Sequence, residues 1–295
     1  MNGQNKKGLT LEKKHGLTGW AFLIPAVALI CWTSFYPMIR AFVLSLQTGM
    51  GVNLSFSGFA NYIRILKDPT FKETMFNTFI YLIIQVPVML VLALVLASVL
   101  NNKDLRFKGF FRTCIFLPCA TSLVSYAMIF KALFANDGFI NTILRALGLN
   151  AVMWFSNPWS ARIVVVLALL WRWTGYNMVF YLAGLQNIEY SVYEAAKIDG
   201  ASPLQTFFKI TVPLLKPTIL MTTITSTNGT LQLFDESLNL TNGGPGKSTM
   251  SMSHYIYNTS FVSSPNFGYA AAMSIIILVL VAILALIQMK VGDER

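Results

Sequence analysis

Residues 194–217 read EAAKIDGASPLQTFFKITVPLLKP and separate two long apolar runs of the chain. The segment from Glu194 to Asp199 is favourable helix material. Gly200 follows at the place where a helix commonly ends in a glycine with positive φ. The start of this stretch therefore predicts a short helix that ends in a glycine turn.

The second half of the same stretch predicts another short helix. Ser202 fits a helix N-cap, Pro203 fits the first helical position, and Gln205 fits the third, so that the three residues make a capping box. Pro213 and Pro217 limit this helix, because proline disrupts a helix interior. We therefore expect a polar pair of short helices at the edge of a membrane domain.

This segment resembles the coupling-helix signature of bacterial ABC importer permeases, which is Glu-Ala-Ala, three residues, Gly, nine residues, Ile, one residue and Leu-Pro. The matching positions are Glu194, Ala195, Ala196, Gly200, Ile210 and Pro213. Val212 stands where leucine is usual, which is a conservative departure. Asp199, Ala201 and Phe207 further resemble the sugar-transporting, maltose-type branch. The resemblance covers roughly residues 17–290, and the alternative is an amphipathic interfacial loop with no partner.

The resemblance implies a transport subunit rather than an enzyme. It implies a homologous second permease subunit, two ABC ATPase subunits, an extracytoplasmic solute-binding protein and a carbohydrate substrate. ATP and Mg²⁺ are then expected on the ATPase chains, with no cofactor or metal on this one. The expected location is the bacterial cytoplasmic membrane, as a multi-pass protein in contact with lipid.

Composition independently indicates a membrane protein. The chain of 295 residues is 55% hydrophobic and only 12% charged, whereas soluble domains average about 25% charged residues. Three cysteines in apolar runs do not suggest a disulfide framework. The net charge of +10 is better explained by membrane orientation than by nucleic-acid binding.

Six apolar runs reach the length of about 20 residues that a transmembrane helix needs. They are 20–46, 77–100, 111–134, 160–185, 214–236 and 269–289. We expect an all-α integral membrane protein with a cytoplasmic N-terminal segment at 1–18, a transmembrane domain at 19–290 containing the coupling segment 188–217, and a cytoplasmic tail at 291–295. Lysine and arginine are moderately enriched in the loops on the side of both termini and of residues 194–217, which predicts that this side is cytoplasmic.

The fifth apolar run contains a polar stripe that is expensive to keep in a bilayer. Thr225, Gly229 and Gln232 recur with Thr222 and Glu236 at spacings of three and four, and Asn228 flanks them. The stripe predicts the lining of a substrate path that hydrogen-bonds hydroxyl groups. The alternative is helix packing, because small and hydroxyl residues also join transmembrane helices.

The fourth run places Trp173, Tyr176, Asn177 and Tyr181 near the centre of the membrane, beside Arg172. Aromatic faces flanked by amide and guanidinium donors suit a sugar, while packing of the helix bundle is the alternative. The maltose-type resemblance implies substrate contacts from this run. On the third run, Ser122, Ser125 and Tyr126 are candidates for the same cavity.

No set of residues suggests catalysis or nucleotide binding. His15 and His254 are placed on opposite sides of the membrane, and no glycine-rich phosphate loop is present in the sequence. Residues 141–149 form an amphipathic external stretch, either a docking surface for a binding protein or an interfacial helix. The alternative function is an ion-gradient-driven secondary transporter of a polar solute, which predicts inverted repeats and intramembrane carboxylates.

Overall fold

The computed structural model describes residues 11–51, 53–102 and 104–293. Most of this part of the chain is helical, with one antiparallel two-stranded hairpin. The elements are α1 (Leu11–Ile30), η1 (Cys31–Phe35), α2 (Tyr36–Ser45), β1 (Gln47–Met50), β2 (Asn53–Phe56), α3 (Ala60–Lys67), α4 (Pro69–Asn101), α5 (Lys108–Ala120), α6 (Leu123–Leu133), α7 (Phe139–Ala146), α8 (Pro158–Gln186), α9 (Tyr190–Ile198), α10 (Pro203–Thr206), η2 (Phe207–Thr211), α11 (Val212–Leu214), α12 (Lys216–Leu231), α13 (Asp235–Thr241), α14 (Met252–Tyr257), η3 (Asn258–Val262) and α15 (Phe267–Asp293).

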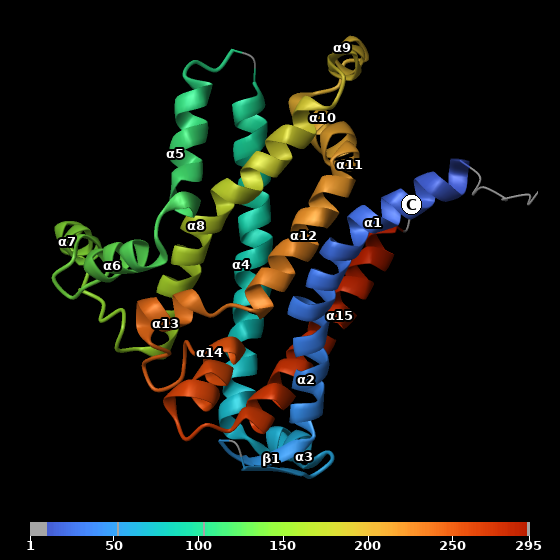
Figure 1. Ribbon diagram of the computed structural model, residues 1–295. Helices are drawn as coiled ribbons and strands as arrows, with labels where there is room; N and C mark the ends of the chain where they lie inside the picture. Colours follow the sequence, from blue (N-terminus) through green and yellow to red (C-terminus); the bar gives the residue numbers. More distant parts are fainter. Residues whose placement is uncertain (1–10, 52, 103, 294–295) are drawn as a thin grey trace, which may run out of the picture.

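Within the described residues, four helices are long and apolar enough to cross a membrane, at 18–45, 69–101, 158–186 and 267–292. Two further pairs of helices reach the required length only if each bent pair counts as one span. The chain is therefore a mostly helical membrane protein with four to six spans. Figure 1 shows α4, α8, α12 and α15 running between an end formed by α9 and an end formed by α3 and the hairpin.

The expectation of one continuous third span at 111–134 is wrong. The helix stops at Ala120, and α5 and α6 meet at 100° (Figure 1). Thr121 and Ser122 are extended, and Thr121 Oγ1 donates to the carbonyl of Pro118 at 2.7 Å. In a continuous helix the carbonyl of Pro118 accepts a hydrogen bond from the backbone. Here the hydroxyl of Thr121 also donates to it, which helps the helix to end at this point.

The expected fifth span at 214–236 begins where predicted, within two residues, but its far end is wrong. Pro217 has no N–H for the carbonyl of Pro213, and a bend of 68° separates α10–α11 from α12. The far end of α12 is Leu231, after which the chain leaves the helix until Asp235. Ser251 Oγ donates to the carbonyl of Leu233 in this interruption. Because of this break, the side chains of Gln232, Phe234 and Asp235 do not continue along the face of α12 but lie beside the other helices.

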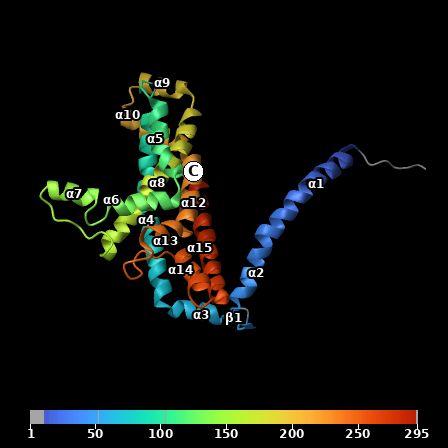
Figure 2. The same ribbon diagram turned by 60° about the vertical axis from the view of Figure 1, so that its left-hand side comes forward.

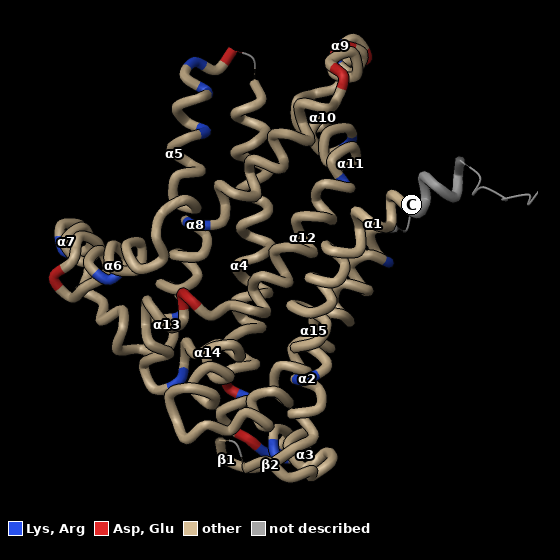
Figure 3. Tube along the Cα trace, in the orientation of Figure 1, with Lys and Arg blue, Asp and Glu red and all other residues tan. Residues whose placement is uncertain are grey.

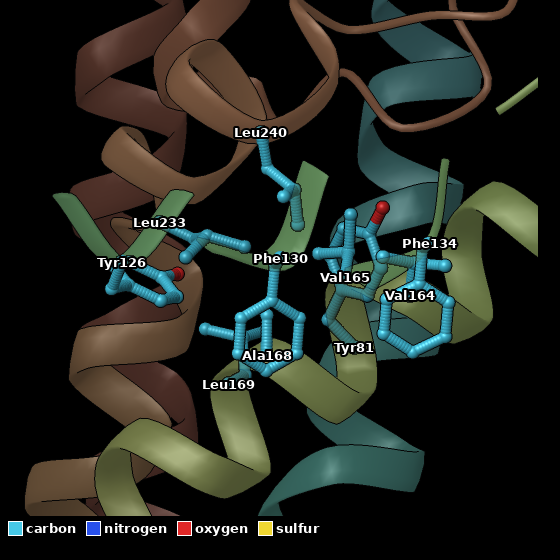
Figure 4. Packing of buried hydrophobic residues seen from close by; sticks show 10 residues of the cluster. All are labelled: Tyr81, Tyr126, Phe130, Phe134, Val164, Val165, Ala168, Leu169, Leu233 and Leu240. Atoms are coloured by element: carbon cyan, nitrogen blue, oxygen red, sulfur yellow. The ribbon is translucent and has the colours of Figure 1, made fainter. Parts of the chain in front are cut away.

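Three clusters of buried apolar residues join the helices. The first, drawn in Figure 4, brings α4, α6, α8 and α13 together around Phe130, Val164 and Val165. The second joins α3, α14 and α15 to the ends of α4 and α12, and the third joins α4 to α8 near the α9 end. The α8 helix takes part in two of the three clusters, and this explains why more than half of its most apolar window is buried.

Gly175 sets the distance between α5 and α8. A Cβ at this position would lie 2.0 Å from the carbonyl oxygen of Ile115. Small residues at such crossings let two transmembrane backbones approach closely. The short α5 therefore packs directly on α8 next to the polar part of that helix.

The first span stands apart from the rest. Figure 2 shows α1 leaning away from the other helices, and no residue in the apolar window of 18–45 is buried. Contact with the bundle comes through α2, which packs on α15. Among the described residues, α1 is thus left largely uncovered by the other helices.

Charged residues are scarce along the middle of α4, α12 and α15 and more frequent toward the ends of the bundle (Figure 3). The predicted N-terminal segment 1–18 falls mainly on residues outside the described part, since α1 begins at Leu11. At the other terminus α15 continues to Asp293, past the expected end of the span at residue 289.

Candidate functional site

The first candidate site is the helix pair formed by α9 and α10. Ser202 Oγ accepts from the backbone N–H of Gln205 at 3.3 Å, and Gln205 Oε1 accepts from the backbone N–H of Ser202 at 2.8 Å. The predicted capping box is therefore present. It fixes the start of α10 by pairing two backbone donors that a helix end otherwise leaves to solvent.

The turn between the two helices is a glycine C-cap. Gly200 has φ +76°, and the N–H groups of Ala201 and Gly200 donate to the carbonyls of Ala196 and Lys197 at 2.9 and 3.2 Å. This pair of bonds is a Schellman motif, which places a glycine at the left-handed position. The predicted positive φ at Gly200 is confirmed.

The second helix ends between the two prolines that were expected to limit it. Its α-helical turn from Pro203 passes into a π-helical turn at Phe207–Thr211 and continues to Leu214. Pro213 lies two residues after the π-helical turn and the helix ends one residue later, in keeping with the missing N–H of proline. The end comes at Leu215, where the chain bends into α12.

The residues predicted for ATPase coupling lie together in this segment. Ala196 is buried, Ala201, Phe207 and Ile210 are half-buried, and Glu194, Ala195, Asp199, Gly200 and Pro213 are exposed. Around them, Ile198 is 85% exposed, Leu204 71% and Phe208 63%. The segment thus presents large apolar side chains at one end of the molecule, where no other part of the described chain covers them.

The second candidate site is a cavity of about 440 Å³ between α4, α8, α12 and the start of α13. Six of the predicted path residues line it: Trp173, Tyr176, Asn177, Thr225, Gly229 and Gln232. They come from α8, α12 and the chain just beyond α12. The structure therefore brings the polar stripes of the fourth and fifth runs to one space.

The other predicted path residues lie outside the lining. Tyr181 is buried, and its hydroxyl accepts from Thr222 Oγ1 at 2.8 Å. Asn228 is exposed on α12 and accepts from Gln232 through its side chain. Ser122 and Ser125 are exposed near the break between α5 and α6, and Tyr126 is buried one turn further on. For these five residues the geometry offers no direct contact with the cavity.

Several lining residues were not singled out as substrate-path candidates. Gln85 and Met89 come from α4, and Ser226, Thr230 and Phe234 come from α12 and its extension. Gln85 Nε2 donates to Met89 Sδ at 3.0 Å, while Gln85 Oε1 accepts from Thr230 Oγ1 at 3.2 Å. A glutamine in the middle of an apolar helix is the sequence signal that points to this wall.

Three ionisable residues complete the lining: Arg172, Asp235 and Glu236. Arg172 lies 5.0 Å from the ring of Tyr126 and 5.5 Å from that of Trp173, and its Nη1 donates to the carbonyl of Thr121 at 3.4 Å. Among the described residues, Arg172 Nε, Glu236 Oε1 and Tyr126 Oη are buried without a hydrogen bond of regular geometry, although Glu236 lies close enough to Tyr126, Trp173 and Arg172 to interact with each of them. Buried polar atoms nearly always form hydrogen bonds, so these three atoms are an unusual feature of this side of the cavity.

A cluster of hydrogen-bonded polar residues fixes Ser237 of α13, the residue next to Glu236. Ser237 Oγ donates to the carbonyl of Thr249 at 2.9 Å and lies 2.8 Å from His254 Nδ1. Burial lowers the pKa of His254, since desolvation penalises the charged imidazole. The hydrogen bonds around Ser237 are therefore made between uncharged groups. Among the described residues no group of three or more His, Cys, Asp or Glu is placed to hold a metal ion.

Residues 89–292 match the family described as the binding-protein-dependent transport system inner membrane component. The lactose transport system permease protein of Rhizobium radiobacter is 49% identical over 290 residues, which cover 97% of both chains. The arabinooligosaccharides transport system permease protein of Halalkalibacterium halodurans is 34% identical, with 97% of this chain and 92% of the relative covered. The trehalose/maltose transport system permease protein of Thermococcus litoralis is 32% identical, with 97% of both covered.

The fold matches a chain in the crystal structure of a bacterial ABC transporter involved in the import of the acidic polysaccharide alginate. The TM-score is 0.84 at 21% identity, with 96% of this chain and 98% of that chain covered. The family match covers more than half of the sequence, and three relatives align over nearly all of it. The chain belongs to the family of binding-protein-dependent transport system inner membrane components, and it is a transport subunit rather than an enzyme.

Proposed function

We propose that this chain is a permease subunit of an ATP-driven importer that moves an oligosaccharide or a related carbohydrate across the bacterial cytoplasmic membrane. The observation that carries the proposal is the direct connection between the two candidate sites. The coupling segment α9–α11 continues through the bend at Leu215 into α12, and α12 lines the cavity. A displacement of the coupling segment is therefore passed to a wall of the cavity.

Carbohydrate is the substrate class that best fits the cavity walls. Trp173 and Tyr176 pack edge to face with ring centroids 5.7 Å apart and offer apolar ring surface. Gln85, Asn177 and Gln232 supply amide donors and acceptors beside these rings. Sugars have C–H faces for aromatic rings and hydroxyls for amides, and relatives of this chain are named for lactose, arabinooligosaccharides and trehalose or maltose.

The energy source is a pair of ABC ATPase subunits that hold ATP and Mg²⁺. Glu194, Asp199 and Gly200 belong to the docking surface, and the exposed Leu204 and Phe208 are its apolar anchors. Such a short helix with projecting apolar residues suits a groove on a partner. ATP acts through differential stabilisation: it favours the closed ATPase pair and hence one position of the coupling segment.

The α9 end then faces the cytoplasm, and the α3 end faces the solute-binding protein outside. Both termini are assigned to the cytoplasmic side, in agreement with the distribution of lysine and arginine. The α7 helix and the loop that contains Gly243 are on the outer side in this orientation. A binding protein that delivers sugar from outside approaches the same end of the cavity that α13 borders.

A second, homologous permease subunit completes the membrane part. In the first span, α1 leans away from its own bundle and no residue of the apolar window is buried, while α2 packs on α15 (Figure 2). Lipid can cover such a helix, but α4 and α15 also leave apolar faces uncovered, with 28% and 22% of their windows buried. Two permease subunits that pack these faces together enclose a path that one chain leaves open.

The test is uptake of radiolabelled sugar into proteoliposomes that contain this chain, its partner permease, the ATPases and the binding protein. We expect lactose, an arabinooligosaccharide, trehalose or maltose to enter when ATP is supplied on the ATPase side. A non-hydrolysable ATP analogue is the control, and it should stop uptake. Uptake that instead follows an imposed ion gradient without ATP would overturn the proposal in favour of a secondary transporter.

A further inference from the structure

The connection between α4 and α5 carries an excess of positive charge at the α9 end of the bundle. Residues 102–112 contain four cations and one acid. Three of the cations belong to the described residues: Arg106 and Arg112 are exposed, and Lys108 is half-buried. Among the described residues, none of these three lies within 4.0 Å of a carboxylate oxygen. Lysine and arginine therefore gather at this end of α5 without an acidic partner there (Figure 3).

Two aromatic rings stand beside these cations and are mostly uncovered. Phe107 is 77% exposed and Phe110 is 66% exposed. Phe107 also has φ +59°, a left-handed conformation that a bulky residue rarely adopts and that glycine adopts without strain. A ring that is exposed on a strained backbone adds little to the packing of the described residues. We therefore expect it to contact something outside the chain.

An exposed apolar stripe begins at the same place and follows α5. Phe110, Cys114 and Leu117 recur at spacings of four and three, so they share one face of the helix, and all three are exposed. The 13 residues of α5 span about 20 Å, and one leaflet of the hydrocarbon core is about 15 Å thick. The length of α5 therefore matches the depth of a single leaflet.

We propose that a basic–aromatic patch, made of Arg106, Phe107, Lys108, Phe110 and Arg112, binds the headgroup of an anionic phospholipid in the cytoplasmic leaflet. The cations pair with the headgroup phosphate, and the two rings lie where headgroups meet acyl chains. An acyl chain of the same lipid covers the apolar stripe of α5. The inference rests on the proposed function only for the placement of this end of the bundle in the cytoplasm.

The basic–aromatic patch is separate from the surface proposed for ATPase docking. In Figure 1 the α4–α5 connection and α9 lie at the same end of the bundle but apart from each other. The far end of α5 is next to the cavity, because Arg172 of the lining donates to the carbonyl of Thr121, one residue past α5. A lipid that holds α5 therefore supports Arg172 and leaves α12 free to follow the coupling segment.

The experiment measures lipid binding to the complete transporter complex in detergent by native mass spectrometry. The probes are phosphatidylglycerol, phosphatidylcholine with the same acyl chains, and glycerol phosphate as a soluble headgroup. We expect phosphatidylglycerol to bind roughly tenfold more tightly than phosphatidylcholine and glycerol phosphate not to bind in the same concentration range. Equal affinity for the two lipids overturns the inference, and so does equally tight binding of glycerol phosphate. Sugar and ATP are left out, so a failure of the proposed function does not alter these outcomes.

A triple variant, Arg106→Gln with Lys108→Gln and Arg112→Gln, tests the cations. It should weaken phosphatidylglycerol binding by roughly tenfold or more, because each cation near an anionic surface contributes about fivefold, and it should leave phosphatidylcholine binding unchanged. The matched control replaces three exposed cations elsewhere in the chain, Lys67, Lys72 and Lys131, by glutamine. Equal effects of the two triple variants on phosphatidylglycerol binding overturn the inference.

Phe107→Gly separates lipid binding from folding, since glycine accepts the positive φ and only the ring is lost. Affinity for phosphatidylglycerol should fall about fivefold, because binding to a lipid surface scales with the apolar area that is buried. The melting temperature without added lipid should stay within about 2 °C of wild type. Unchanged lipid affinity in this variant overturns the role given to the ring.

Gel filtration of the cation triple variant with the ATPases tests a protein partner instead of a lipid. We expect assembly as in wild type. If the ATPases dissociate from this variant and remain bound to the Lys67, Lys72 and Lys131 control, the basic–aromatic patch is a protein contact and the inference is overturned.

Discussion

Arg162 on α8 donates from Nε and Nη2 to Asn77 Oδ1 on α4, at 3.2 and 2.9 Å. Arg162 Nε also donates to the carbonyl of Ser248 at 2.9 Å, and Asn77 Nδ2 donates to the carbonyls of Lys247 and Met250 at 2.9 and 3.0 Å. Among the described residues Arg162 has no acidic partner. The pair therefore fastens the loop after α13 to the two central helices through hydrogen bonds alone.

Replacement of Arg162 by Met should destabilise the protein by roughly 3 kcal/mol, because Asn77 Oδ1 and the Ser248 carbonyl lose their donors while they stay buried. The measurement is thermal unfolding of the purified protein in detergent. Arg145→Met is the control: Arg145 forms an exposed ion pair with Asp137, and exposed pairs contribute about 0–1 kcal/mol. Equal effects of the two substitutions would contradict the role given to Arg162.

Asp68 should contribute stability that disappears at acid pH. Burial acts to raise its pKa, but hydrogen bonds from the hydroxyls of Tyr255 and Tyr269 and from backbone N–H groups outweigh it, so the pKa lies below the ordinary value of 3.8. A carboxyl with a depressed folded-state pKa stabilises above its unfolded value and loses that contribution as pH falls through the folded-state value. The contribution is therefore complete at neutral pH and declines below about pH 4.

The check is the melting temperature of wild type and Asp68→Asn between pH 3 and pH 8. The difference should be constant from pH 8 to pH 5 and should shrink below pH 4, as the wild-type carboxyl gains a proton. Both tyrosine hydroxyls lie 2.6 Å from Asp68 Oδ2, so α3, α14 and α15 are joined at this point. A difference that grows as the pH is lowered would refute the assignment.

Gly200→Val should uncouple sugar uptake from ATP hydrolysis while the subunit still inserts. A β-branched residue at φ +76° is strained by roughly 1–3 kcal/mol, which distorts the turn between α9 and α10. Uptake and ATPase activity of reconstituted complexes are measured together. Gly51→Val places the same strain at φ +60° in the hairpin, and it should leave the ratio of uptake to hydrolysis unchanged.

Cysteine labelling tests the orientation. In a background without Cys31, Cys114 and Cys119, a cysteine at the exposed Leu204 should react with an impermeant reagent only from the cytoplasmic side. A cysteine at the exposed Lys247 should react only from outside. Reversed accessibility would overturn the assignment of the ATPase docking surface to the α9 end.

Two substitutions of Tyr176 should reduce sugar transport to different extents. Tyr176→Phe removes a hydroxyl from the cavity and keeps the ring, so it should weaken sugar binding by roughly 1 kcal/mol, or about fivefold. Tyr176→Ala also removes the ring surface and should impair uptake further. Assembly with the ATPases should persist in both variants, and wild-type uptake by Tyr176→Ala across a range of sugar concentrations would assign this residue to packing.

The coupling segment shows how far local sequence rules reach. The capping box at Ser202 and Gln205 and the left-handed Gly200 follow from residues within three or four positions of each other, and all three have the predicted geometry. The polar stripes on the fourth and fifth runs were likewise readable, because polar residues in apolar helices are rare. These features depend on residues that are neighbours along the chain, so the local sequence is sufficient to predict them.

The two broken spans were not readable by the same rules. Hydropathy over 111–134 and 214–236 measures the preference for apolar surroundings and carries no information on whether the helix continues. The breaks at Thr121 and after Leu231 involve side-chain hydrogen bonds, and the second bond joins Leu233 to Ser251, which is 18 residues further along the chain. Tyr181 illustrates the same limit, since its partner Thr222 lies on a different helix.

The sequence by itself determined that this chain is a helical membrane protein, that two short helices meet at the glycine turn of Gly200, and that α8 and α12 carry polar stripes. Periodicity, capping and apolar length depend on residues that are close in the sequence, so they do not depend on how the helices pack together. Only the tertiary structure decided which polar residues share one cavity. The bend at Leu215, the exit from α12 at Leu231 and the close crossing at Gly175 bring Gln85, Arg172 and Glu236 together from three separate helices, because packing and not chain position sets those distances.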